Sequence, residues 1–133
     1  PVRTAICHCR YCQLRTGAAF GISVYFNITQ VTFNDAPYDT YSYDTEGGNT
    51  GILTRCANCG TNVSWKMSLE ALKDTIGIAG GTFDPPTFWY EIEREVFARS
   101  KADFCQISSP QSFETSPISK PVREDGGRLK GST

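Results

Sequence analysis

The sequence lacks an excess of charge of either sign. Its 13 Lys and Arg residues nearly balance its 14 Asp and Glu residues, so the formal net charge is −1 and the isoelectric point is about 5.8. A protein that binds a polyanion usually carries a strongly basic balance or a basic patch. The composition therefore argues against nucleic acid as a partner.

Long apolar runs are also absent. No stretch approaches the roughly 20 apolar residues that a helix needs to cross a bilayer, and nothing resembles a signal peptide with a basic start and an apolar centre. We therefore predict no membrane partner and a cytoplasmic location. The sequence does not identify the native N-terminus, because the chain begins at Pro1 and not at a methionine.

The length of the chain suits one domain. A protein of 133 residues and 14.7 kDa can bury a core but has little room for two. We predict a single domain over residues 1–107. From about Ile107 the sequence is poor in apolar residues and rich in Ser, Pro and charge, which does not offset the entropy of ordering. Residues 108–133 are therefore expected to form a tail that is loosely structured or draped over the surface.

The apolar pattern predicts an all-β fold of short antiparallel strands. Residues 18–26 alternate large apolar side chains with Gly, Ser and Tyr, which is the period of a half-buried strand. Only residues 68–74 suggest a helix, with Ser68 as its N-cap and apolar residues three apart. Further strands are expected over residues 38–43, 52–55, 62–66, 75–81 and 88–95.

Cysteine is the residue type that most needs an explanation. Five of the six cysteines lie in two short segments, CHCRYC with Cys7, Cys9 and Cys12, and CANCG with Cys56 and Cys59. Disulfide frameworks usually spread cysteines to link distant loops, whereas these are too close together for separate partners. The spacing favours metal binding.

The CHCRYC segment has the spacing of a three-sulfur site. Cys7 and Cys9 project to the same side of an extended chain, and a turn through the next two residues brings Cys12 back to join them. Three thiolates and one open position are typical of catalytic zinc, where water or a substrate atom completes the tetrahedron. The only histidine, His8, projects the other way, so we expect it to be solvated or paired in the core and not a fourth ligand.

The CANCG segment has the features of half a structural zinc site. Cys56 and Cys59 bracket two residues, and Gly60 then permits a tight turn. A redox pair is the alternative, but such motifs usually open a helix in a βαβ unit, and the flanks here predict strands. Another alternative merges the clusters into one four-sulfur structural zinc that uses two of the three upstream cysteines. The remaining cysteine, Cys105, is expected to be a small buried apolar residue.

The segments CHCRYCQLRTGAAF, RCANCGTNVSW and DTIGIAGGTFDPP, in this order, resemble the glutathione-dependent formaldehyde-activating enzyme family, which also includes centromere protein V. The resemblance spans residues 5 to about 100. It implies a β-tent fold with a catalytic zinc held by Cys7, Cys9 and Cys12. It also implies a structural zinc held by Cys56, Cys59 and an early C-x-C motif.

The chain departs from that family pattern at two places. The early C-x-C motif would precede the first residue, and we expect that its segment is absent from this sequence. Gln13 stands where relatives usually have a basic residue, so the family's glutathione specificity does not transfer automatically.

The resemblance implies a carbon–sulfur lyase that adds a thiol to an aldehyde or releases it. The expected partner is a small-molecule substrate, such as glutathione or another thiol, and the oligomeric state stays open. Arg10 or Arg15 is a candidate for contacting an anionic substrate, and Tyr11 for lining a pocket. Two alternatives remain. One is a lyase, hydrolase or isomerase that acts on a larger metabolite, and the other is a non-catalytic zinc module in which a fourth protein ligand closes the three-cysteine site. Ordered strands argue against a simple metal buffer.

Overall fold

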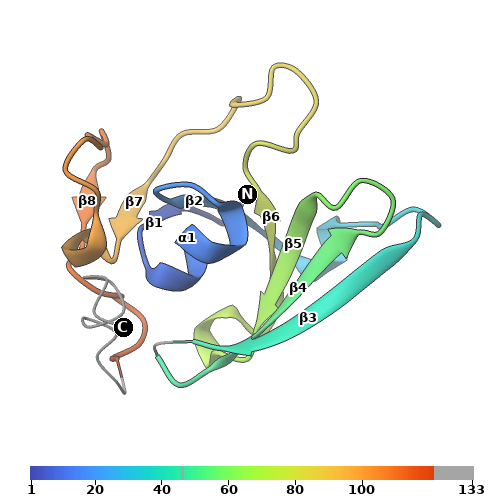
Figure 1. The fold of residues 1–133 in the computed structure, drawn as a ribbon, viewed down its shortest axis with the longest axis horizontal. Helices are drawn as coiled ribbons and strands as arrows, with labels where there is room; N and C mark the ends of the chain where they lie inside the picture. Colours follow the sequence, from blue (N-terminus) through green and yellow to red (C-terminus); the bar gives the residue numbers. More distant parts are fainter. Residues whose placement is uncertain (46, 122–133) are drawn as a thin grey trace.

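The computed structural model describes residues 1–45 and 47–121. Strands dominate this part of the chain, and it contains one α-helix and three short 3₁₀ helices (Figure 1). The elements are β1 (Arg3–Cys7), α1 (Arg10–Thr16), β2 (Gly21–Asn27), η1 (Ile28–Gln30), β3 (Tyr38–Asp44), β4 (Thr50–Cys56), β5 (Asn62–Met67), η2 (Glu70–Leu72), β6 (Thr75–Ala79), β7 (Arg94–Val96), η3 (Ala98–Ser100) and β8 (Gln111–Ser112).

All the strands belong to one eight-stranded sheet with the order β3-β4-β5-β6-β2-β1-β7-β8. Most neighbours are antiparallel, but β1 and β7 are parallel, as are β7 and β8. The sheet bends strongly, and α1 lies on its hollow side (Figure 1). The prediction of an all-β fold with one short helix is confirmed, and the β-tent assignment rests on the resemblance alone.

Alternation along the strands gives the sheet two different faces. On β1, Arg3, Ala5 and Cys7 share one face, while Ile6 lies on the other face and is 5% exposed. On β2 the second face carries Val24, which is fully buried. The face that carries Cys7 therefore forms the hollow side of the sheet.

The helix is in a different place from the predicted one. Ser68 does not cap a helix, because its hydroxyl accepts a hydrogen bond from the Thr50 backbone N–H at 2.9 Å. Residues 68–74 therefore contain only the single turn η2, which buries Leu72. The turn expected after Cys9 is instead the start of α1, which ends at Gly17 with a positive φ of 65°.

One expectation about strands was wrong. The segment 88–95 pairs in the sheet only from Arg94 onward, because the aromatic residues before it pack on one another. Phe83 lies 5.5 Å from the Trp89 ring and 5.8 Å from the Tyr90 ring. These aromatic residues gave the segment its strand-like composition without a strand partner. The sequence analysis also missed β1.

The C-terminal segment follows β7 beyond the two residues of β8. Phe113 N–H donates to the Glu95 carbonyl at 2.9 Å, and Phe97 N–H donates to the Thr115 carbonyl at 2.9 Å. The predicted tail thus contributes an edge strand up to this point. Residues 122–133 of that tail lie outside the described residues.

Candidate metal centre

Three sulfur atoms meet where β1 ends and α1 begins. Cys7 is the last residue of β1, Cys9 is the N-cap of α1, and Cys12 lies in its first turn. The three Sγ atoms lie within 4.8 Å of one another. Cys9 is buried, and Cys7 and Cys12 are partly buried. The helix thus achieves the convergence for which the sequence suggested a turn.

Local bonding explains why Cys12 closes onto Cys9. The Cys12 backbone N–H points at the Cys9 sulfur, 3.5 Å away, which is the usual N-cap contact made by a thiol. The helix then places Arg15 one turn later, and its Nη2 lies 3.5 Å from the Cys12 sulfur. The cluster therefore has a fixed guanidinium beside one of its sulfurs.

The three thiols of the cluster differ in the direction of their pKa shifts. Hydrogen bonds from Cys7 and Cys9 lower the pKa of Cys12 well below its ordinary value, against the effect of burial, and Arg15 lowers it further. The pKa of Cys7 and that of Cys9 are raised, chiefly by their hydrogen bonds to Cys12 and also by the loss of contact with water. One thiolate is thus favoured by the protein alone.

The donor set fits a zinc ion. Zinc binds thiolates at about 2.3 Å, so sulfurs on a tetrahedron lie roughly 3.8 Å apart. That separation is compatible with the observed limit of 4.8 Å between the three sulfurs. Soft thiolate ligands also select zinc over hard cations such as magnesium or calcium.

A cavity of about 150 Å³ opens beside the three sulfurs on the hollow side of the sheet. All three cysteines line it, as do Tyr11 and Arg15, whereas Arg10 does not. Its other lining residues include Arg3, Ala5, Ser23, Tyr25, Tyr43, Trp65, Arg94 and the segment 116–119.

Arg15 joins the sulfur cluster to an aromatic wall. Its guanidinium carbon lies 3.7 Å from the ring centroid of Trp65, which is 2% exposed. This is a stacked cation–π contact. Trp65 in turn lies over Gly77, where a Cβ atom would come within 2.3 Å of the indole Nε1. The glycine allows the indole to lie flat against the sheet.

A second aromatic wall faces the helix. Tyr11 of α1 stacks on Tyr43 of β3, with ring centroids 6.0 Å apart. Tyr43 lies over Gly51, where a Cβ atom would come within 2.6 Å of the phenol ring. Burial raises the pKa of both Tyr25 and Tyr43, so these phenols stay protonated at neutral pH. The walls of the cavity are therefore largely apolar, with neutral hydroxyl groups.

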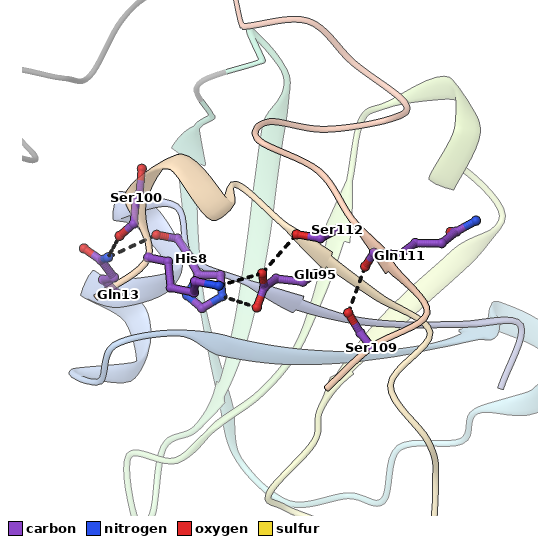
Figure 2. A network of polar contacts seen from close by, with 8 residues as sticks. His8, Gln13, Glu95, Ser100, Ser109, Gln111 and Ser112 are labelled. Carbon is purple, nitrogen blue, oxygen red and sulfur yellow. Dashed lines mark hydrogen bonds and ion pairs between the residues drawn. The ribbon is translucent and has the colours of Figure 1, made fainter. Parts of the chain in front are cut away.

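His8 lies on the other face of the sheet from the sulfur cluster. It is fully buried, and its Nε2 lies 3.2 Å from Oε2 of Glu95 (Figure 2). The other carboxylate oxygen, Oε1, accepts from Lys101 at 3.2 Å and from Ser112 at 3.1 Å. These contacts match the expectation that His8 is paired in the core. They also connect the cysteine loop to the C-terminal segment.

Gln13 is a structural residue here. Its side-chain N–H donates to the His8 carbonyl at 3.0 Å and to the Ser100 carbonyl at 3.3 Å (Figure 2). The residue that follows the third cysteine thus ties α1 to η3 and does not line the cavity. The cation beside the sulfurs is Arg15 instead.

Cys56 and Cys59 lie apart from the three-sulfur cluster. The turn between them is closed by the Gly60 N–H, which donates to the Cys56 carbonyl at 2.8 Å, and Gly60 has a positive φ of 77°. Hydrogen bonds with Thr61 lower the pKa of Cys59, which is exposed. Within residues 1–45 and 47–121, the only group of three or more close metal ligands is Cys7, Cys9 and Cys12. The structure thus does not support one merged four-sulfur site.

Several residues of the site were not found from sequence. Arg3, Trp65 and Arg94 line the cavity, and Glu95 holds the cysteine loop from behind. Arg3 could have been found from the sequence. It lies four residues before Cys7, and residues an even number apart along a strand lie on the same face of the sheet. Cys105 was expected to be buried but is only partly so.

A comparison with protein families gives a match to this chain. A family model described as glutathione-dependent formaldehyde-activating enzyme matches residues 1–100. The curated proteins contain no match to this chain. Among the described residues, none of the helices has the length and apolar character needed to cross a membrane.

Proposed function

The chain belongs to the glutathione-dependent formaldehyde-activating enzyme family, and on that premise we propose that it is a zinc-dependent carbon–sulfur lyase. It would add a thiol to an aldehyde, or catalyse the reverse release. The observation that carries this proposal is that three cysteine sulfurs meet at the wall of a cavity. A site with three protein ligands next to a cavity has room for a substrate atom as the fourth ligand.

The reaction balances without an oxidant or reductant. The thiol sulfur forms a bond to the carbonyl carbon, the π bond of the carbonyl breaks, and the thiol proton is transferred to the carbonyl oxygen. Release reverses each of these changes. When bound, zinc would supply Lewis acidity that lowers the pKa of the substrate thiol.

The residues of the chain would contribute in three ways. Cys7, Cys9 and Cys12 would hold the ion, and three thiolates on Zn²⁺ leave a net charge of −1. Arg15, 3.5 Å from the Cys12 sulfur, balances that charge. The aromatic walls would displace water from around a bound substrate, which would strengthen each electrostatic contact there.

Cys56 and Cys59 would supply half of a separate structural zinc site. Their turn holds both cysteines at the end of the β4–β5 hairpin, away from the cavity. Among the described residues, no group of three metal-ligating side chains within 4.8 Å of one another includes this pair. The role is therefore assigned from the C-x-x-C-G spacing and the family resemblance.

The test combines metal content with turnover. Zinc per chain and activity with formaldehyde and glutathione are measured for the wild type, for Cys9→Ser and for the control Cys105→Ser. Cys9→Ser should abolish turnover while most of the fold remains, and Cys105→Ser should retain activity, because Cys105 does not line the cavity. Full activity in Cys9→Ser would remove this cysteine from the mechanism.

Zinc content, turnover and a cobalt spectrum together separate the other two functions. A hydrolase, lyase or isomerase of a larger metabolite would bind zinc at the three cysteines but show no turnover with small aldehydes and thiols. A non-catalytic module would bind zinc with no exchangeable fourth ligand, so added thiols would leave the spectrum of a cobalt-substituted protein unchanged. The cavity beside the sulfurs favours an enzyme over such a module.

A further inference from the structure

Two parts of the chain that follow opposite edges of the sheet meet at the cavity. β3 and β8 are the two edge strands, and both Gly47, in the turn after β3, and Ser119, after β8, line the cavity. A Cβ atom at Gly47 would lie 3.1 Å from the Ser119 Oγ. In Figure 1 the chain after β8 runs along the hollow side toward the turn between β3 and β4. The wall on this side of the cavity is therefore made by chain outside the strands.

The closing segment, residues 113–119, is held in place by backbone hydrogen bonds. Phe97 N–H donates to the Thr115 carbonyl at 2.9 Å, and Ala98 N–H donates to the Phe113 carbonyl at 3.0 Å. Bonds between backbone groups do not depend on the side chains of the segment. Those side chains are thus available to shape the cavity.

The backbone of Phe97 supports a role for this wall. Phe97 has a φ of 54° and a ψ of 40°, and it is the only residue other than glycine with a positive φ within residues 1–45 and 47–121. A bulky residue adopts this conformation at a cost, and such residues cluster at functional sites. Phe97 lines the cavity, and its N–H is held by Thr115 of the closing segment. The two therefore form one wall.

The wall is largely apolar and leaves little room. Phe97, Pro117 and Ile118 line the cavity, and Ile118 is half-buried. The Ile118 N–H donates to the Ser116 Oγ at 3.2 Å, which fixes the local turn. The cavity of about 150 Å³ has the volume that, in an engineered apolar cavity, holds a molecule of the size of benzene. A short apolar group fits such a space, whereas a longer chain would meet the wall.

We propose that Phe97 and the closing segment set the size limit of the substrate, with Ile118 as the residue that limits its length. This inference rests on the proposed function and specifies the aldehyde, whose carbon chain is short and apolar. The family model matches residues 1–100, so the closing segment lies outside the matched part of the chain. The size limit is thus a property of this chain's own C-terminal segment.

The test uses alkyl chains of two lengths as rulers. Binding of 1-butanethiol and of 1-hexanethiol to the zinc-loaded full chain is measured by calorimetry, and turnover of formaldehyde, butanal and hexanal with one common thiol is measured in parallel. In the wild type the longer thiol should bind no more tightly than the shorter one. Ile118→Ala removes the branched end of the side chain, so it should bind 1-hexanethiol about tenfold more tightly than 1-butanethiol, the gain expected for two more buried methylenes. A tenfold preference for 1-hexanethiol already in the wild type would overturn the size limit.

Two further variants make the result specific. Ile118→Phe narrows the same space and should weaken the binding of 1-butanethiol about tenfold, which tests the proposal if Ile118→Ala fails to fold. Ile107→Ala is the matched control, because Ile107 is also half-buried but does not line the cavity. It should leave both affinities unchanged. The same gain for 1-hexanethiol in Ile107→Ala would show a general effect of core loosening and overturn the role of Ile118.

The outcomes separate the size limit from the proposed function. Turnover of the aldehydes with the same length preference in the wild type and in Ile118→Ala would contradict the size limit and support the lyase. A length preference in thiol binding that changes in Ile118→Ala, without turnover of any aldehyde, would contradict the lyase and support the size limit. Absence of both turnover and thiol binding would overturn both.

Discussion

His8 and Glu95 form a buried pair behind the metal centre, with His8 Nε2 3.2 Å from Glu95 Oε2 (Figure 2). His8 lies between two of the three cysteines in sequence but faces the opposite side of the sheet. Glu95 lies beside Val96, which pairs with Cys7. The pair therefore fixes the loop that carries Cys7 and Cys9 without contacting the cavity.

Removal of the Glu95 charge should destabilise the protein. Glu95→Gln leaves His8 and Lys101 without their carboxylate in a site where Glu95 is 2% exposed. The expected loss in the free energy of unfolding is about 1.5–3 kcal/mol, the range for hydrogen bonds to charged groups. Urea unfolding at neutral pH measures it.

Glu70→Gln is the matched control for this substitution. Its carboxylate is 84% exposed and forms an ion pair with Lys73, three residues later. Exposed pairs of this kind contribute little, so the control should unfold like the wild type. If Glu95→Gln and Glu70→Gln have equal stability, the buried pair has no structural role.

The same carboxylate should make stability depend on pH. Burial raises the pKa of Glu95, but hydrogen bonds from His8, Lys101 and Ser112 outweigh that effect and hold it below its ordinary value of 4.5. A carboxyl with a lowered pKa in the folded state stabilises the protein above its unfolded pKa and loses this contribution as the pH falls below it. The stabilisation is thus complete well above pH 4.5 and declines below it.

The measurement is the difference in unfolding free energy between the wild type and Glu95→Gln at several pH values from 6 to 3. The cysteines titrate in both proteins, so their contribution cancels in the difference. The gap should narrow as the pH falls below the ordinary carboxyl range. A gap that stays constant to the lowest pH would show that the charge on Glu95 is not what stabilises the fold.

The wall of the cavity gives a separate prediction about packing. Gly77→Ala would place a Cβ atom 2.3 Å from the Trp65 Nε1 and 2.9 Å from its Cδ1. Trp65 would have to move, at a cost of about 1–3 kcal/mol for overpacking, and its contact with Arg15 would be disturbed. The unfolding temperature and the rate of turnover should both fall.

Gly81→Ala is the control for this change. A Cβ atom at Gly81 would meet no atom within 4 Å, and the substitution should preserve stability and activity. If both alanine variants behave alike, the close packing of Trp65 on Gly77 does not shape the cavity.

The sequence predicted the class of the fold and the convergence of the three sulfurs, because both follow from local patterns. Alternation located β2, turn and glycine signals bounded β3 to β6, and the C-x-C and C-x-x-C spacings limited where three thiols can point. The prediction of which residue caps a helix was less reliable. Ser68 bonds to Thr50 across the sheet, and a cysteine became the N-cap of α1.

The remaining parts of the site depend on contacts between distant parts of the chain. Glu95 and Arg94 reach β1 only because β7 pairs with it in parallel after a long connection. Trp65 meets Arg15 only through the bend of the sheet. No local pattern in the sequence encodes such contacts, so the cavity and the positions of Trp65 and Arg94 in its wall emerged only from the structure.

The C-x-x-C turn gives the last prediction. Cys59→Ser should reduce bound zinc and lower the unfolding temperature, because a structural zinc site stabilises only the folded chain. Cys105→Ser, which removes a partly buried thiol outside both cysteine segments of the sequence, should change neither quantity. Zinc content and thermal unfolding are measured together, before and after treatment with a chelator. The chelator should remove the difference in unfolding temperature between the wild type and Cys59→Ser, since both chains then lack the ion. If Cys59→Ser keeps full thermal stability and zinc content, Cys59 does not hold a structural zinc, and the turn is maintained by its own hydrogen bonds.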